Sequence, residues 1–186
     1  HGIVSAINAF RVHTLVITGD FDPLDPATAL ANINQILCRT LELGEFATFI
    51  VGTLDLLTHE FIYATAGAPP PIIGHFTKRE ARLCEARGLP VGVSAAATYE
   101  NRYTQLLPNE FLLLYSDALT DAPDGAGKPT GWDGLRQIVA DVPRHADPAV
   151  TLDRLWMQLR GGIPSPPPDD LTIAVLGRPA RKESAS

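Results

Sequence analysis

The chain has 186 residues, of which 45% are hydrophobic and 19% are charged, and its formal net charge is −6. This length and composition suit one folded domain with a sizeable core and exclude a largely disordered chain. The acidic balance excludes a typical nucleic-acid-binding surface, which needs clustered Lys and Arg side chains. No apolar run reaches the roughly 18 residues of a membrane-spanning helix, and no secretory signal pattern is present. We therefore expect a cytoplasmic protein that binds neither nucleic acid nor membrane.

The two cysteines, Cys38 and Cys84, lie far apart in the sequence and show no spacing typical of a metal site. We interpret them as small buried hydrophobic residues in a reducing compartment. This interpretation agrees with a cytoplasmic location.

Two helices are expected in the first 41 residues. Residues 3–17 contain neither Gly nor Pro and carry apolar residues near helical spacing. The second helix has Asp25 as its N-cap and Pro26 at its first position. Its apolar face consists of Leu30, Ile33, Leu37 and Leu41.

After Gly44 the sequence changes to β-branched and aromatic runs separated by turn residues, which predicts strands. Six such runs are present. The first two flank a short loop and are expected to form a hairpin, the third and fourth are expected to pair with each other, and the fifth leads through a turn into the sixth. These runs are residues 46–55, 60–67, 71–76, 81–86, 99–107 and 111–116. The order predicts an antiparallel meander.

The last third of the chain returns to helical spacing at residues 131–142 and again at 147–160, where Asp147 is the expected N-cap. Trp132, Trp156 and Met157 fall within these helical patterns and are interpreted as core residues. A Pro-rich stretch then leads into residues 171–177, a last short buried strand. Helices that precede and follow a run of strands predict an α+β fold with antiparallel sheets.

Acidic residues stand at the ends of two of these strands. Asp117 follows the strand 111–116, and Asp169 and Asp170 precede the strand 171–177. If the two strands are antiparallel neighbours, these carboxylates lie at one edge of a sheet, and their repulsion calls for a cation between them. Oxygen ligands without His or Cys favour Mg²⁺ or Mn²⁺. A single Asp at a strand end is usually a turn former or a cap, and Asp121 is interpreted in that way.

Four segments together resemble the successive motifs of the PPM-type metal-dependent protein phosphatases. They are residues 47–73, 88–93, 107–122 and 168–176. The resemblance is greatest to the bacterial SpoIIE-like and RsbU-like phosphatases, and it extends in order from about residue 1 to 176. It implies an antiparallel β-sandwich flanked by helices, with a binuclear Mn²⁺ or Mg²⁺ centre at one end.

In that family the Asp of the "YSDALTD"-like motif and the first Asp of the "DDLT"-like motif bind one metal, so the resemblance assigns these roles to Asp117 and Asp169. Asp170 would be a weaker ligand or a turn residue. The resemblance implies metal-activated hydrolysis of phosphoserine or phosphothreonine without a covalent enzyme intermediate. It further implies a phosphorylated protein as substrate, such as an anti-anti-sigma-type regulator.

The sequence departs from the family pattern at three places. Ala118 stands where the family usually has Gly after the metal-binding Asp, and Ala68 stands where it often has His. The first residues, "HGIVSA", resemble the end of an Asp-x-x-Gly-His-Gly motif whose Asp would lie before His1. We therefore expect residues 1–178 to be a phosphatase domain without its N-terminal strands, followed by a flexible tail at 179–186.

Such a chain would bind metal and hydrolyse substrate weakly, and its uncovered sheet edge or face would favour a homodimer. Two alternatives remain open. The first is an inactive phosphatase-like module that binds a phosphoprotein or transmits a signal through its N-terminal helices. The second is a scaffold whose acidic loops only cap strands. Finding the Asp of this motif before His1 would favour the enzyme over the binding module.

Overall fold

The computed structural model describes residues 3–42, 44–124, 127–143, 145–163 and 169–180, with side chains from residue 9 onward. The start of the "HGIVSA" motif, most of the Pro-rich stretch and most of the expected tail lie outside these residues. The chain divides into two compact units. Unit 1 consists of His1–Ala68 and Ala86–Thr104, and unit 2 consists of Pro69–Glu85 and Gln105–Ser186.

Unit 1 contains two helices and a small sheet, as the sequence predicts. Helix α1 spans Ile3–Thr18 and helix α2 spans Pro26–Thr40. Strands β1 (Phe49–Leu54) and β2 (Glu60–Ala66) form the expected antiparallel hairpin. Strand β5 (Arg102–Gln105) follows β2 in the sheet order β1-β2-β5.

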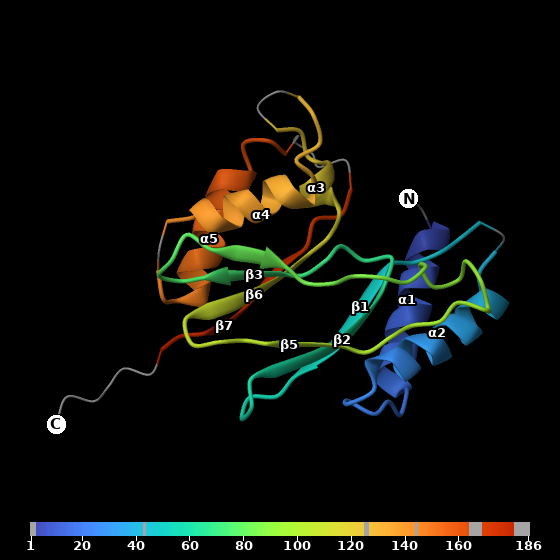
Figure 1. Cartoon of the computed structure of the whole chain (residues 1–186). Coiled ribbons are helices and arrows are strands. Elements are labelled where there is room, and N and C mark those ends of the chain that lie inside the picture. Colours follow the sequence, from blue (N-terminus) through green and yellow to red (C-terminus); the bar gives the residue numbers. More distant parts are fainter. Residues whose placement is uncertain (1–2, 43, 125–126, 144, 164–168, 181–186) are drawn as a thin grey trace. The chain divides into compact units, whose positions relative to one another are not determined.

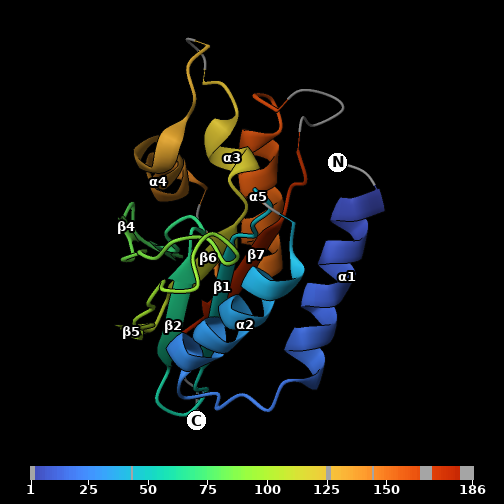
Figure 2. The same cartoon turned by 90° about the vertical axis from the view of Figure 1, so that its right-hand side faces the viewer.

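The core of unit 1 lies between α2 and the hairpin, where Figure 2 shows α2 crossing the strands. Two leucines and one isoleucine on one face of α2 are each at most 1% exposed. They pack against two alanines of β2 and a valine from the segment before β5. These residues are Leu30, Ile33, Leu37, Ala64, Ala66 and Val91. Among the described side chains of helix α1, from residue 9 onward, Val12 and Leu15 pack against this cluster, while Phe10 is 71% exposed. The helix is thus confirmed, but part of its apolar face stays at the surface.

The start of α2 is fixed by a reciprocal contact between two side chains. Asp25 Oδ1 accepts hydrogen bonds from the Thr28 amide at 3.2 Å and from Asn101 Nδ2 at 2.8 Å. Asn101 Oδ1 in turn accepts from the Ala27 amide at 2.8 Å. The hydrogen bonds from Thr28 and then Asn101 lower the pKa of Asp25 from its ordinary value of 3.8. The N-cap expected from the sequence is therefore confirmed, and it also ties the helix to a distant loop.

Unit 2 is built on a four-stranded antiparallel sheet in the order β4-β3-β6-β7. Its strands are β3 (Ile72–His75), β4 (Ala81–Leu83), β6 (Glu110–Tyr115) and β7 (Ile173–Arg178). Its helices are α3 (Ala118–Asp121), α4 (Gly131–Asp141) and α5 (Pro148–Leu159), and α5 begins at the expected cap Asp147. Figure 1 shows α4 and α5 together on one side of this sheet.

Alternate residues of the unit 2 strands point toward these helices and form the second core. Its central members are each completely buried: Ile72, Phe111, Leu113, Leu119, Leu135 and Leu155. This core holds β6 in the middle of the sheet, between β3 and β7.

The simple meander expected from the strand order is wrong, although the antiparallel sheets are confirmed. Strands β5 and β6 follow each other in the chain but belong to different sheets. The two edges of β6 are already paired with β3 and β7, so no edge of β6 remains for β5. Strand β7 is an edge strand with partly exposed residues rather than a fully buried strand.

Several residues that the sequence interpretation places in the core are at the surface. Trp132, Trp156 and Met157 are 55%, 39% and 65% exposed. Other residues, among them Leu135 and Leu155, occupy the faces of α4 and α5 that point into the core. The helical periodicity was predicted correctly, but the prediction placed the wrong residues of each helix in the core. Cys38 and Cys84 are half-buried rather than buried, and they form no disulfide. Within the described part of the chain, no helix combines the length and the apolar character needed to cross a membrane.

The first prediction concerns the cap of α2. Replacing Asp25→Ala removes two side-chain hydrogen bonds and should lower the melting temperature at neutral pH. Because folding lowers the pKa of this carboxyl, its contribution to stability is present above pH 3.8 and is lost as the pH falls through the folded-state pKa. Thermal unfolding followed by circular dichroism at neutral and acid pH should show a difference that shrinks in acid. The exposed Asp20→Ala serves as control, and an equal difference at both pH values would contradict the assignment.

The second prediction tests which face of α5 is in the core. Leu155 is completely buried, so Leu155→Ala should reduce the free energy of unfolding by about 2–5 kcal/mol. Met157 is 65% exposed on the same helix, so Met157→Ala should change it by no more than about 0.5 kcal/mol. Urea unfolding measures both values, and a larger loss for Met157→Ala than for Leu155→Ala would show that the helix is rotated.

Candidate functional site

The candidate site lies at one edge of the unit 2 sheet, where β6 ends and β7 begins. The two strands are antiparallel neighbours, with Tyr115 opposite Ile173, as the sequence argument required. Asp117 follows the end of β6, and Asp169 and Asp170 precede the start of β7. The fold therefore brings the two acidic segments together from positions about fifty residues apart in the chain.

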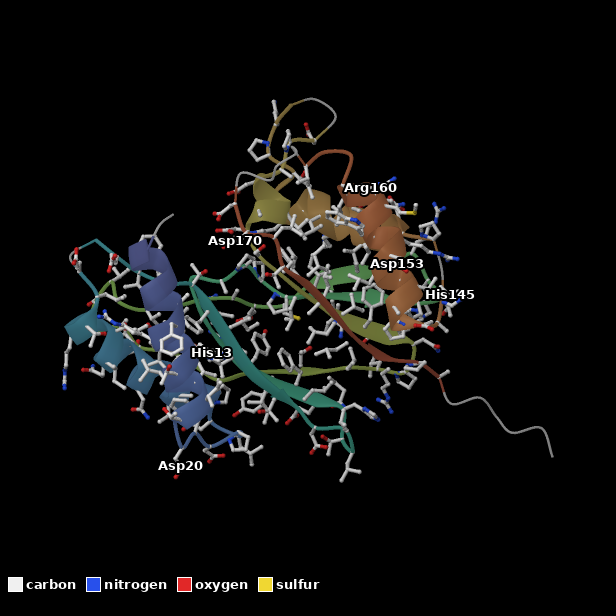
Figure 3. The ribbon with its side chains drawn as sticks, turned by 180° about the vertical axis from the view of Figure 1, so that it is seen from behind. His13, Asp20, His145, Asp153, Arg160 and Asp170 are labelled. Atoms are coloured by element: carbon white, nitrogen blue, oxygen red, sulfur yellow. The ribbon has the colours of Figure 1, made fainter. Side chains whose placement is uncertain are left out.

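Ser116 joins these two segments directly. Its amide donates to the Thr172 carbonyl oxygen at 3.0 Å, which extends the β6–β7 ladder by one residue. Its hydroxyl donates to the Asp170 carbonyl oxygen at 3.0 Å and accepts from the Thr172 amide at 3.0 Å. Figure 3 shows Asp170 at the entrance to β7, beside α3. Sequence reasoning missed this contact, although a hydroxyl side chain directly before Asp117 was a signal for it.

Asp117 begins the short helix α3 through its backbone, while its carboxylate makes no capping hydrogen bond. The Asp117 carbonyl oxygen accepts from the amides of Thr120 at 2.8 Å and Asp121 at 2.9 Å. It also accepts from the Thr120 hydroxyl at 2.9 Å. The side chain is exposed. Capping a helix is a usual structural role for an Asp at a strand end. The Asp117 carboxylate does not have this role, because it makes no capping hydrogen bond to α3.

Asp169 and Asp170 are both exposed. Asp169 Oδ1 accepts a hydrogen bond from the amide of Asp170 at 2.8 Å, so this carboxylate is oriented by its own loop. Asp170 is held through its carbonyl oxygen by Ser116. The loop therefore has a defined backbone where it presents its two carboxylates.

The donor chemistry at this edge fits a hard divalent cation, because the acidic side chains offer oxygen atoms only. The set is partial, however. Among residues 3–42, 44–124, 127–143, 145–163 and 169–180, no three or more His, Cys, Asp or Glu side chains gather closely enough to hold a metal ion. Asp117, Asp169 and Asp170 thus share an edge without converging on one point.

Two neighbours of Asp117 are buried. Ala118 is 8% exposed and lies in the first turn of α3, and it is not among the residues with positive φ. Its backbone therefore does not need the glycine that the resemblance implies at this position. The Tyr115 hydroxyl has no hydrogen-bond partner within the described part of the chain, and burial, with a smaller effect of Cys84, raises the pKa of this phenol. Tyr115 packs with its ring in the unit 2 core and is 9% exposed.

The backbone at Gly67, directly before Ala68, requires glycine. Gly67 has a φ of +70°, and a Cβ at this position would lie 2.6 Å from a Pro90 side-chain atom. A side chain here would therefore be both strained and obstructed. Ala68, which replaces the frequent family His, follows directly.

Comparisons with known proteins agree with this arrangement. The profile of the family described as Stage II sporulation protein E (SpoIIE) matches residues 1–179. The phosphoserine phosphatase RsbU of Bacillus subtilis is 25% identical over 100 residues, which cover 53% of this chain and 29% of RsbU. The chain thus spans under a third of the length of that relative.

Two solved structures show the same fold. The RsbU and RsbW domains of Rv1364c from Mycobacterium tuberculosis align with a TM-score of 0.76 and 26% identity, covering 97% of this chain and 50% of that one. The phosphatase domain of SpoIIE from Bacillus subtilis, presoaked with Mn, aligns with a TM-score of 0.59 and 20% identity, covering 94% of this chain and 73% of that one. The α+β fold expected from the resemblance is confirmed, and the chain belongs to the SpoIIE family of PP2C-type phosphatase domains.

Proposed function

We propose that the protein is a Mn²⁺- or Mg²⁺-dependent phosphoserine/phosphothreonine protein phosphatase of a bacterial signalling pathway. The observation that carries this proposal is the antiparallel pairing of β6 and β7, which puts the Asp117 segment beside the Asp169–Asp170 segment. Membership of the SpoIIE family gives this acidic edge its chemical interpretation. The names of the relatives, a phosphoserine phosphatase and a Mn-presoaked phosphatase domain, support both the reaction and the metal.

In this proposal Asp117 and Asp169 hold the cation and Asp170 contributes more weakly. A bound divalent cation would neutralise charge on the phosphoryl oxygens and lower the pKa of a water molecule. The chain's own residues supply oxygen ligands on two segments that hydrogen bonds hold side by side. Their exposure at the surface leaves room for a phosphorylated side chain that belongs to another protein.

The finer assignments are proposals of the same kind. The substrate would be a phosphorylated protein such as an anti-anti-sigma-type regulator. The protein would be located in the cytoplasm and would form a homodimer. The family match over residues 1–179 supports a phosphatase domain that extends over about residues 1–178. The family description, Stage II sporulation protein E, and the description of SpoIIE from Bacillus subtilis as a cell fate determinant favour a signalling role.

The third prediction tests the metal ligands. In the full-length protein, Asp117→Asn and Asp169→Asn should each reduce Mn²⁺-stimulated hydrolysis of p-nitrophenyl phosphate by at least about 100-fold. Loss of a residue that only supports a metal ligand usually reduces metal affinity or activity by about 10–100-fold. Loss of a ligand itself should reduce activity by at least as much. Steady-state rates measured across a Mn²⁺ titration provide the comparison.

Asp133→Asn is the matched control, because Asp133 is an exposed carboxylate on α4 with a side chain that is 88% exposed. It should keep the wild-type rate. Undiminished hydrolysis by Asp117→Asn would refute the site. If the unmodified full-length protein binds a phosphoprotein but does not hydrolyse it at any Mn²⁺ concentration, the inactive binding module replaces the phosphatase.

A further inference from the structure

The Ser116 side chain occupies an unusual place between the two acidic segments. Its hydroxyl bonds to the backbone on both sides of Leu171, since it donates to Asp170 and accepts from Thr172. A hydroxyl can make both bonds because it carries one donor hydrogen and two acceptor lone pairs. The last backbone hydrogen bond between the two chain segments joins the Ser116 amide to the Thr172 carbonyl oxygen. Beyond it, the Ser116 side chain makes the hydrogen bonds that the backbone of one more β6 residue would otherwise make.

The two segments that Ser116 joins differ in how the core holds them. The Asp117 segment lies between Tyr115, which is 9% exposed, and Leu119, which is completely buried. The Asp169–Asp170 segment is exposed, and the nearest residue that packs on the core is Leu171, which is only partly buried. Packing alone therefore fixes the first segment more firmly than the second.

We infer that Ser116 is a positioning residue that sets the separation of the Asp117 and Asp169 carboxylates, and through it the affinity of the site for a divalent cation. This inference rests on the proposed function. Ser116 would not touch the substrate. It would hold the β7 entrance loop against the end of β6, so that little ordering of this loop is needed when a cation binds.

Removal of the hydroxyl has a defined structural consequence. In Ser116→Ala, the Thr172 amide and the Asp170 carbonyl oxygen lose their partner while the Ser116 backbone rung to Thr172 remains. The loop before Thr172 should then open more often. Ser116→Thr retains a hydroxyl, and its β-branched side chain suits a strand end, so it should restore both bonds.

The fourth prediction uses the full-length protein with Ser116→Ala, Ser116→Thr and a control, Ser94→Ala. Ser94 also bonds a backbone amide through its hydroxyl, that of Ala96 at 3.3 Å, but lies in unit 1. Three quantities are measured: hydrogen exchange of the Thr172 amide without metal, the Mn²⁺ dissociation constant by electron paramagnetic resonance, and the rate of phosphate ester hydrolysis across a Mn²⁺ titration.

We expect Ser116→Ala to speed exchange at Thr172 and to raise the Mn²⁺ dissociation constant about 10–100-fold, the range seen for residues that support metal ligands. The maximal rate should be approached again at saturating Mn²⁺. Ser116→Thr and Ser94→Ala should keep the wild-type dissociation constant. A purely structural role would instead lower the maximal rate and leave the Mn²⁺ midpoint unchanged.

The outcomes separate this inference from the proposed function. Faster exchange in Ser116→Ala with an unchanged Mn²⁺ dissociation constant would overturn the positioning role, while hydrolysis by the wild type would leave the phosphatase assignment intact. A wild type that binds Mn²⁺ with the expected dependence on Ser116 but hydrolyses nothing would overturn the phosphatase and support the positioning role. A wild type that does not bind Mn²⁺ would overturn both.

Discussion

The antiparallel pairing of β6 with β7 is the constraint on which the candidate site depends. It joins residues that are far apart in the sequence, and its register puts Tyr115 opposite Ile173. Because each strand has acidic residues at the end that reaches the same edge, the pairing places the acidic segments side by side. A shift of the register by one residue would also reverse the faces of β7, moving its apolar residues away from the helices. The core and the site are therefore determined by the same register.

The features that sequence reasoning predicted correctly are those set by local interactions. The caps Asp25 and Asp147 accept hydrogen bonds from amides two or three residues away, so their roles can be inferred from neighbouring residues alone. The hairpin of β1 and β2 depends on a short loop and alternating side chains. The features that it missed depend on distant partners. The position of β5 was decided by β3 and β7, which occupy both edges of β6.

The side of each helix that packs into the core also depends on distant partners and not on local interactions. Helical spacing predicted α5 correctly, but the sequence contains both Leu155 and Trp156, and nothing local says which of them points inward. Tertiary packing selected Leu155 and left Trp156 39% exposed. At the candidate site, the position of Asp117 after a buried strand was readable from the sequence. The hydroxyl bridge from Ser116 was not, because it requires the register of a strand that lies more than fifty residues further along the chain.

The exposure of the carboxylates explains why the scaffold matters for the proposed chemistry. Exposed acidic side chains compete with water for a cation and pay for their ordering when they bind it, so loose carboxylates bind weakly. Here the backbone on each side is already ordered: Asp117 by the start of α3, and Asp169 by its own bond to the Asp170 amide. Ala118 adds to this order, since its methyl group is buried at the first helical position and its backbone needs no glycine. An alanine in place of the glycine that the resemblance implies thus reduces the conformational freedom of the unfolded chain without straining the folded one, and it is compatible with the proposed metal site.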